Sequence, residues 1–207
     1  MSDFYPILLR LKGKPVLVIG GGRVAERKVE SLLKYSAKVF LVSRGLTPGL
    51  QKLLDENKIV FLGQEFCESY LDGKFLVIVA TNDPLFNRSI SDKARQKGVL
   101  VNVVDQPSDC DFIVPSVVKR GDLIISISTS GKIPFISKKI REKLESMYGS
   151  EHRIALEIMA AVRQALIRAG ERDKEKVYEK LYNSDILRKI KSKDVEGVVR
   201  IIARALC

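Results

Sequence analysis

The chain has 207 residues, 45% hydrophobic and 29% charged, so it can bury a core and is typical of a globular rather than a disordered protein. Its formal net charge of +11 is uneven: residues 1–112 carry 16 Lys/Arg and 13 Asp/Glu, whereas residues 113–207 carry 20 and 12. The basic second half indicates an anionic partner, but interleaved acids, sparse aromatics and the absence of Trp argue against a nucleic-acid surface.

The first 112 residues alternate strand-like and helix-like patterns. Short apolar runs predict strands at residues 16–19, 39–42, 59–61, 75–80 and 99–104. Periodic apolar residues predict helices between them, at residues 23–35, 48–57 and 87–97. Strands that alternate with helices favour an α/β fold with a parallel, doubly wound sheet covered on both faces. We expect ligands to bind beyond the carboxyl ends of its strands.

The pattern changes after Pro107. Residues 112–118 and 123–128 predict an antiparallel hairpin outside the main sheet. The remainder reads as helical, with helices at about 135–147, along an apolar stripe from Ile154 to Ala169, and at 173–182 and 194–205. A hairpin with one apolar face is marginal in water, so we expect a second copy of the chain to cover it in a homodimer.

The segment from Gly20 to Ala25 is the most informative motif. It places Gly20-x-Gly22-x-x-Ala25 directly after the first predicted strand and at the start of the first predicted helix. Gly20 permits a tight turn, Gly22 lets the backbone approach a pyrophosphate, and Ala25 lets helix and strand pack closely. The helix N-terminus offers N–H groups and partial positive charge to phosphates. This context predicts a dinucleotide-binding Rossmann domain.

The second predicted strand ends at Ser43 and Arg44, where dinucleotide-binding sheets often carry an acid that binds the ribose 2′-OH. No acid stands here. Ser43 could still bind the ribose, and Arg44 could bind the 2′-phosphate of NADP, cover the adenine or be an ordinary surface arginine. These residues therefore leave the choice between NAD and NADP open.

Asp105 follows the fifth predicted strand, which we expect to be a central strand, and lies at the carboxyl end of the sheet, where a nicotinamide would bind. A carboxylate there could act as a general acid or base. The alternative is a turn residue shortly before Pro107. Thr81 and Asn82 follow the fourth predicted strand and reach the same edge.

The cysteines and the histidine indicate mainly which kinds of site we do not expect. The three cysteines, Cys67, Cys110 and Cys207, are widely spaced, and His152 is the only histidine, so we expect neither a metal site nor disulfides. The N-terminus lacks a signal-peptide pattern and the longest apolar runs are only strand length. We therefore expect a cytoplasmic protein without a membrane span.

Several segments match one known family when they are taken together and in order: Tyr5-Pro6-Ile7, residues 11–14, 18–28 and 80–83, Asn102-Val103-Val104-Asp105, and residues 111–116 and 127–134. They resemble the precorrin-2 dehydrogenases of siroheme biosynthesis, which include the dehydrogenase/ferrochelatase half of siroheme synthase. The resemblance runs from residue 1 to about 150 and is weaker over the helical tail.

The resemblance implies oxidation of precorrin-2 to sirohydrochlorin with NAD⁺, with Fe²⁺ insertion as an added activity of some members. It implies a homodimer with a Rossmann domain (1–112), a dimerisation region (113–149) and a helical domain (150–207). The family's catalytic aspartate corresponds to Asp105. Its nucleotide contacts correspond to Gly22, Arg23, Val24, Ala25, Ser43, Arg44, Gly45, Thr81 and Asn82. The substrate is a polycarboxylate tetrapyrrole, which the basic second half could attract.

Two other classes of function stay open. A nicotinamide-sensing dimeric regulatory module would share the Rossmann start, but it would normally carry the acid that Ser43 and Arg44 replace and would not need Asp105. A nucleic-acid-binding protein is suggested only by the pI of about 9.6. The sequence does not decide whether Fe²⁺ or Co²⁺ is also inserted.

Overall fold

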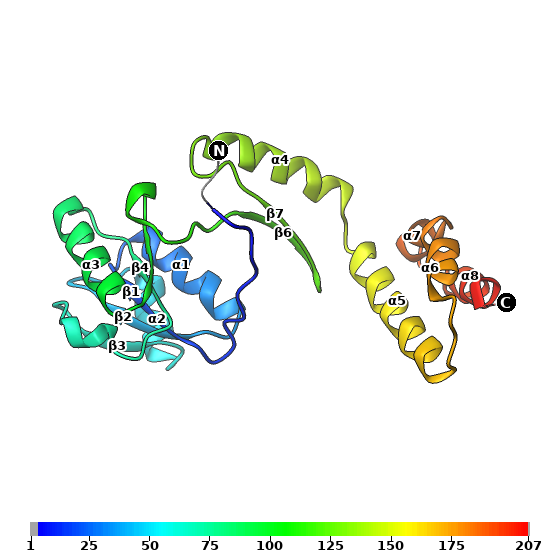
Figure 1. Cartoon of the computed structure of the whole chain (residues 1–207), viewed down its shortest axis with the longest axis horizontal. Coiled ribbons are helices and arrows are strands. Elements are labelled where there is room, and N and C mark those ends of the chain that lie inside the picture. Colours follow the sequence, from blue (N-terminus) through cyan, green and yellow to red (C-terminus); the bar gives the residue numbers. More distant parts are fainter. Residues whose placement is uncertain (1–3, 207) are drawn as a thin grey trace. The chain divides into compact units, whose positions relative to one another are not determined.

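In the computed structural model, which describes residues 4–206, the chain divides after Val114 into two units (Figure 1). The first unit alternates strands and helices along the chain. Its elements are β1 (Pro15–Ile19), α1 (Arg23–Lys34), β2 (Lys38–Val42), α2 (Pro48–Asp55), β3 (Val60–Gly63), η1 (Glu68–Leu71), β4 (Leu76–Val79), α3 (Pro84–Gln96), β5 (Leu100–Val103) and η2 (Pro107–Asp109).

The five strands form one parallel sheet in the order β3-β2-β1-β4-β5. Because β2 and β3 extend the sheet on one side of β1 while β4 and β5 extend it on the other, the strand order reverses between β1 and β4. Ligands of open α/β sheets bind at such a switch point, outside the carboxyl ends of the strands. The predicted α/β fold class is confirmed.

Helices cover both faces of this sheet. On one face, Ala25, Val29 and Leu32 of α1 and Leu50 of α2 pack against alternate residues of β1, β2 and β4. On the other face, Ile90 and Ala94 of α3 pack against the intervening residues. The central strand residues Leu17 and Val18 are fully buried, one on each face. Burial on both faces explains why the strands are nearly continuous apolar runs.

The second unit begins with the predicted hairpin, formed by β6 (Ser116–Arg120) and β7 (Leu123–Ile127). Gly121 supplies the positive φ of +62° that its tight turn requires. Helix α4 (Pro134–Met147) packs along both strands, and the Arg120 guanidinium donates to the carbonyls of Glu145 and Tyr148 near the end of α4. This arginine thus satisfies carbonyl groups that a helix end leaves without intrahelical partners.

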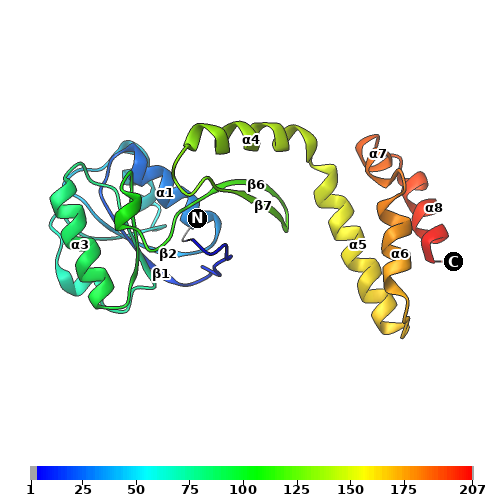
Figure 2. The same ribbon diagram turned by 45° about the horizontal axis from the view of Figure 1, so that its top comes forward.

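The rest of the second unit is helical (Figure 2): α5 (Glu151–Arg168), α6 (Lys174–Tyr182), α7 (Ile186–Lys191) and α8 (Val195–Leu206). These helices share one apolar cluster, in which Leu181 is fully buried. Of the predicted stripe on α5, Val162 and Leu166 are buried, whereas its alanines Ala161, Ala165 and Ala169 are exposed. Ala155, which is outside that stripe, is buried as well.

The two short helices expected at 173–182 and 194–205 are confirmed as α6 and α8, but the helix between them, α7, was not predicted. Six residues are too few to show a clear apolar period. Ile186, which is 3% exposed, anchors α7 in the cluster, and tertiary packing therefore stabilises a segment whose own pattern is uninformative. Between residues 4 and 206, the chain has no helix of the length and apolarity needed to cross a membrane.

Candidate functional site

The turn after β1 depends on glycine at its first position. Gly20 has a φ of +120°, which side chains rarely adopt, and a Cβ there would overlap the carbonyl group of Ala80. The Gly20 N–H donates to the Val42 carbonyl over 2.9 Å, and the Ala80 N–H donates to the Ile19 carbonyl over 2.8 Å. The turn is therefore held between the ends of β2 and β4.

The surroundings of Gly21 are crowded, whereas those of Gly22 are open. A Cβ at Gly21 would overlap the carbonyl oxygen of Gly45 and the hydroxyl of Ser43. A Cβ at Gly22 would meet no atom within 4 Å, and the extended backbone there suits any residue. Sequence reasoning missed the role of Gly21, because the motif does not reveal which loop approaches it. Gly22 faces open space in front of the helix.

The N-terminus of α1 differs from those of the other two α-helices in this unit. The Thr47 hydroxyl accepts from the Leu50 N–H over 3.3 Å in α2, and the Asp83 carboxylate accepts from the Phe86 N–H over 3.0 Å in α3. The Gly22 cap of α1 has no side-chain hydrogen bond. No side chain at Gly22 caps the first N–H groups of α1, and donors left available in this way suit a pyrophosphate.

The register of the sheet brings the predicted site residues to one edge. Ile19 pairs with Val42 and with Val79, and Val79 pairs with Val103. The residues that follow these four positions therefore all leave the sheet at its carboxyl end. They include Gly20, Gly22, Ser43, Arg44, Gly45, Thr81, Asn82 and Asp105, while Arg23, Val24 and Ala25 form the first turn of the helix beside them.

An acid does lie near the end of β2, although it comes from another strand. The Arg44 guanidinium donates to both carboxylate oxygens of Glu65, over 3.0 and 3.1 Å. This pairing lowers the pKa of Glu65 and raises that of Arg44. The expectation that no acid stands at this position holds for the local sequence only. No local signal identifies Glu65, because it is 21 residues from Arg44.

Ser43 and Thr81 are both held by short-range contacts. The Ser43 hydroxyl donates to the Gly45 carbonyl over 2.6 Å and thereby orders the loop after β2. The Thr81 hydroxyl donates to Oδ1 of Asn87, whose Nδ2 donates to the Thr81 carbonyl over 3.1 Å. Asn87 is only 3% exposed. Sequence reasoning missed this buried asparagine, which fixes the loop that carries Asn82.

Asp105 lies in the loop that leaves β5. The expectation that this strand is central is wrong, because the following strands β6 and β7 form a separate hairpin and leave β5 outermost in its sheet. Its side chain is exposed, and its φ of +61° is a left-handed conformation that Asp and Asn tolerate better than most residues. The Val104 N–H donates to the Val79 carbonyl over 2.9 Å, so the ladder between β4 and β5 continues up to the residue before Asp105. The carboxylate is thus carried on a strained but anchored turn.

The segment after Asp105 folds back along β5 and is fixed by buried polar contacts. Nδ2 of Asn102 donates to the Phe112 carbonyl over 2.9 Å, and the Val101 N–H donates to the Asp111 carboxylate over 3.1 Å. The Cys110 thiol donates to the Val103 carbonyl over 3.2 Å. Burial raises the pKa of this thiol. Asn102 and Cys110 therefore hold the loop rather than face its ligand side.

Lys28 on α1 is a charged neighbour of this loop that sequence reasoning did not single out. Burial lowers its pKa most, and the positive charge of Arg27 lowers it further. The charges of Cys110 and Asp105 act in the opposite direction. Lys28 therefore belongs to the electrostatic environment of Asp105.

The described residues of the second unit, 115–206, contribute no comparable cluster of chemical groups. The His152 ring lies 4.9 Å from the Tyr148 ring, and its Nδ1 is buried without a hydrogen-bond partner in the part of the chain described. Across residues 4–206, no three His, Cys, Asp or Glu side chains gather as a metal site would require. Cys207 lies outside the described residues.

Comparison with known proteins identifies a family. A model of the family described as "Putative NAD(P)-binding" matches residues 7–116, which is the first unit almost entirely. Among solved structures, the chain is similar to "SirC, precorrin-2 dehydrogenase", with a TM-score of 0.78, 23% identity and 98% of each chain covered. At this identity the likeness concerns the fold.

Curated relatives are more similar in sequence but longer. The chain is 41% identical to siroheme synthase 1 of Serratia proteamaculans over 174 residues, which cover 82% of this chain and 37% of that protein. It is 36% identical to the siroheme synthase of Zymomonas mobilis over 208 residues, covering 99% of this chain and 44% of that protein. The chain thus spans less than half the length of either relative.

Proposed function

The chain belongs to the NAD(P)-binding family whose model spans residues 7–116, and on that premise we propose that it oxidises precorrin-2 to sirohydrochlorin with NAD⁺ as hydride acceptor. Its similarity to two siroheme synthases over 82% and 99% of its length supports this proposal. The shared fold with a precorrin-2 dehydrogenase is consistent with it.

One observation carries the proposal most directly. The uncapped N-terminus of α1 meets a glycine turn at the point where the strand order reverses, and a Cβ at Gly22 would enter open space. A dinucleotide needs this combination, because its pyrophosphate requires free N–H donors and close approach to the backbone. A glycine-rich turn with a purely structural role would have no need for the space in front of Gly22.

The residues at the carboxyl ends of the strands would each bind a different part of the cofactor. The N–H groups of Arg23, Val24 and Ala25 would bind the pyrophosphate, and the loop from Ser43 to Gly45 would hold the adenosine ribose. Thr81 and Asn82 would lie nearer the nicotinamide. When bound, the nicotinamide supplies a hydride acceptor.

Asp105 would take the proton. Conversion of precorrin-2 to sirohydrochlorin removes a hydride and a proton, so one placed base suffices for the proton. The carboxylate of Asp105 is exposed on the loop after β5, two strands from the glycine turn. In this role Asp105 touches substrate and is the catalytic residue.

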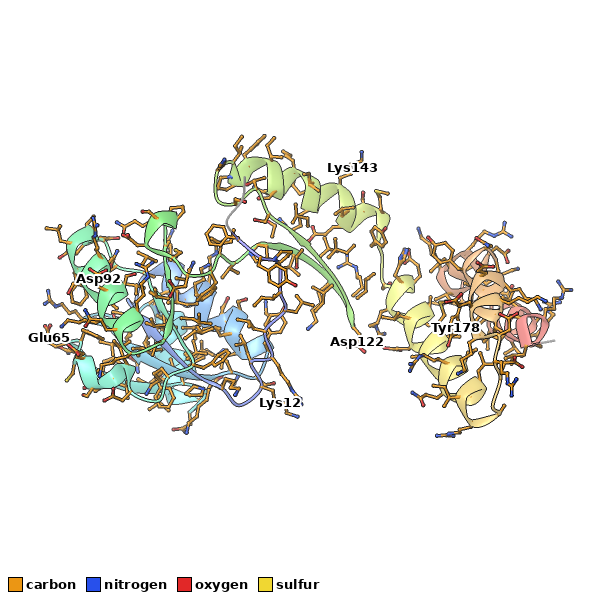
Figure 3. The ribbon with its side chains drawn as sticks, in the orientation of Figure 1. Lys12, Glu65, Asp92, Asp122, Lys143 and Tyr178 are labelled. Carbon is orange, nitrogen blue, oxygen red and sulfur yellow. The ribbon has the colours of Figure 1, made fainter. Side chains whose placement is uncertain are left out.

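Anaerobic incubation with precorrin-2 and NAD⁺ tests the activity, with sirohydrochlorin absorbance as readout. We expect turnover by the unmodified protein and a fall in kcat of about 100-fold or more in Asp105→Asn, the usual scale of general base catalysis. Asn is the suitable replacement because it also tolerates a positive φ. Asp92→Asn is the matched control, since Asp92 is an exposed carboxylate of the same unit, on α3 (Figure 3).

The outcomes separate the parts of the proposal. Full activity of Asp105→Asn would refute the base assignment alone. NAD⁺ binding without turnover would instead favour the regulatory module. A subsequent addition of Fe²⁺ to the product tests metal insertion in the same sample.

The substrate's carboxylates would be attracted by the basic second half of the chain, with 20 Lys/Arg against 12 Asp/Glu over residues 113–207. Such attraction between exposed charges weakens as salt is added. We therefore expect kcat/KM to fall as ionic strength rises. A flat profile would exclude this electrostatic contribution.

A homodimer is the assembly that the second unit supports. Helix α4 carries the apolar side chains of Phe135, Ile136, Ile140 and Met147, each at least 42% exposed in the single chain. A patch of this kind on one helix is typical of an interface. Light scattering at micromolar concentration should give the mass of two chains, and a monomer would contradict the proposal.

A cytoplasmic location follows as a further proposal. Cys67 and Cys110 are free thiols, and the Cys110 thiol is held by backbone carbonyls rather than by another sulfur. Free thiols suit a reducing compartment. Cell fractionation with detection of the protein would test this.

A further inference from the structure

The ion pair between Arg44 and Glu65 occupies the position that decides between NAD and NADP in this kind of sheet. Arg44 is the second residue after β2, where the adenosine ribose of a dinucleotide binds. The Ser43 N–H donates to the Gly63 carbonyl over 3.1 Å, so the ends of β2 and β3 lie at the same level. Glu65, two residues beyond β3, is thereby brought beside Arg44 at the edge of the first unit (Figure 3).

Stability alone does not explain this pair. The two side chains are 81% and 74% exposed, and ion pairs this exposed contribute little to folding. Their geometry is nevertheless specific, since Nε and Nη2 of Arg44 each reach a different carboxylate oxygen. A two-point contact of this type fixes the guanidinium plane and occupies the donors that would otherwise bind a phosphate.

We propose that Glu65 makes the dinucleotide site select NAD over NADP. Its carboxylate neutralises Arg44, occupies two of its donors and repels the additional phosphate that NADP carries on the ribose 2′ position. The inference deepens the proposed function and rests on it, because selection requires that a dinucleotide bind here. Glu65 thus replaces, from the end of β3, the acid that other sheets carry at the end of β2.

The test measures dissociation constants of NAD⁺ and NADP⁺ for the full chain at low ionic strength. We expect Glu65→Gln to tighten NADP⁺ binding about fivefold, the scale of one exposed charge pair, while NAD⁺ binding changes less than about twofold. Glu65→Asp retains the charge and should retain the preference for NAD⁺. The gain in Glu65→Gln should shrink at high salt, because exposed charges are screened.

A matched control separates the position of Glu65 from its charge. Glu68 on η1 is also an exposed carboxylate, but its partner is Lys93, 3.1 Å away. Glu68→Gln changes the net charge by the same amount and should leave the ratio of the two dissociation constants unchanged. Arg44→Ala combined with Glu65→Gln should remove most of the gain, because Arg44 would provide the phosphate contact.

The outcomes distinguish the inference from the function on which it rests. If the unmodified chain binds neither dinucleotide, both are overturned. If it binds NAD⁺ but Glu65→Gln leaves the ratio unchanged, the inference alone fails. An equal gain for Glu68→Gln, or a preference of the unmodified chain for NADP⁺, would also overturn the inference.

Discussion

The two units differ in how completely they bury their apolar residues. In the first unit, the residues of β4 are at most 2% exposed, and helices cover both faces of the sheet. In the second unit, α4 has Ser137 as its one buried residue, while Phe135 is 64% exposed. The first unit therefore closes its own core and presents polar loops at one edge. The second unit exposes apolar side chains on α4, the surface that the proposed homodimer would cover.

The second unit is itself uneven. Helices α5 to α8 surround a small cluster centred on Leu181, whereas the hairpin and α4 lack a fully enclosed core. Under the proposed function, chemistry and assembly would fall to different parts of the chain.

The largest effect on stability is expected from truncation of one buried leucine in each of the two cores. Leu17→Ala in β1 and Leu181→Ala in α6 each remove a fully buried side chain, which costs about 3–5 kcal/mol of unfolding free energy. We expect Leu17→Ala to reduce NAD⁺ binding and Leu181→Ala to preserve it, as followed by calorimetry and cofactor titration. Equal loss of binding in both variants would show that the units do not fold independently.

Glycine substitutions separate folding from binding within the first unit. Gly20→Ala should cost about 3 kcal/mol, because its φ is +120° and a Cβ would overlap Ala80. Gly22→Ala should change stability by less than about 1 kcal/mol but weaken NAD⁺ binding about tenfold or more, since the new methyl group enters the pyrophosphate space. Thermal unfolding and NAD⁺ titration measure the two effects. Undiminished NAD⁺ binding by Gly22→Ala would contradict the site.

The apolar surface of α4 is tested by Phe135→Ser. Loss of a central aromatic contact typically weakens association by about 2 kcal/mol, so the mass by light scattering should shift toward the monomer. Stability of the first unit should not change. Lys143→Ser is the control, because Lys143 is an exposed, charged residue of the same helix. A dimer of unchanged strength in Phe135→Ser would place the interface elsewhere.

The smallest effect concerns Lys28, whose pKa is lowered from its ordinary value of 10.5 mainly by burial. Because folding disfavours its charged form, the cost is fully present at neutral pH and is relieved as pH rises through the folded pKa toward 10.5. Lys28→Met should therefore stabilise the protein at pH 7 by about 0.5 kcal/mol, and the gain should shrink in alkaline solution. Denaturant unfolding at several pH values measures this.

The exposed Lys34 on the same helix provides the comparison for that series. Lys34→Met removes an exposed charge from this helix and should leave the stability at pH 7 unchanged. A pH-independent gain in Lys28→Met would indicate an effect of packing rather than of charge.

Local pattern predicted the first unit well because its strands are buried on both faces. Their apolar runs identified all five, and the ends differ from the structure by one or two residues, as for β1 and β4. Pattern predicted the second unit less well. Helix α7 is too short to show a period, and Ala161 and Ala165 of α5 resemble part of a core face without being buried.

The residues of the candidate site likewise fall into those that local sequence predicted and those that it did not. Gly20 and Gly22 were identified because their role depends on neighbouring residues, namely a strand before them and a helix after them. Gly21, Glu65 and Asn87 were not identified. Gly21 and Glu65 act on residues from other strands, and Asn87 acts through a buried contact to Thr81 that no motif reveals.

By itself, the sequence determined the fold class, the glycine turn and the place of Asp105 at the end of β5, because each follows from apolar periodicity and short-range spacing. Only the tertiary structure decided that an acid stands beside Arg44 and that Gly22 faces open space. The physical reason is the sheet register, which brings residues far apart in the chain to one edge and depends on pairing between strands rather than on any single segment.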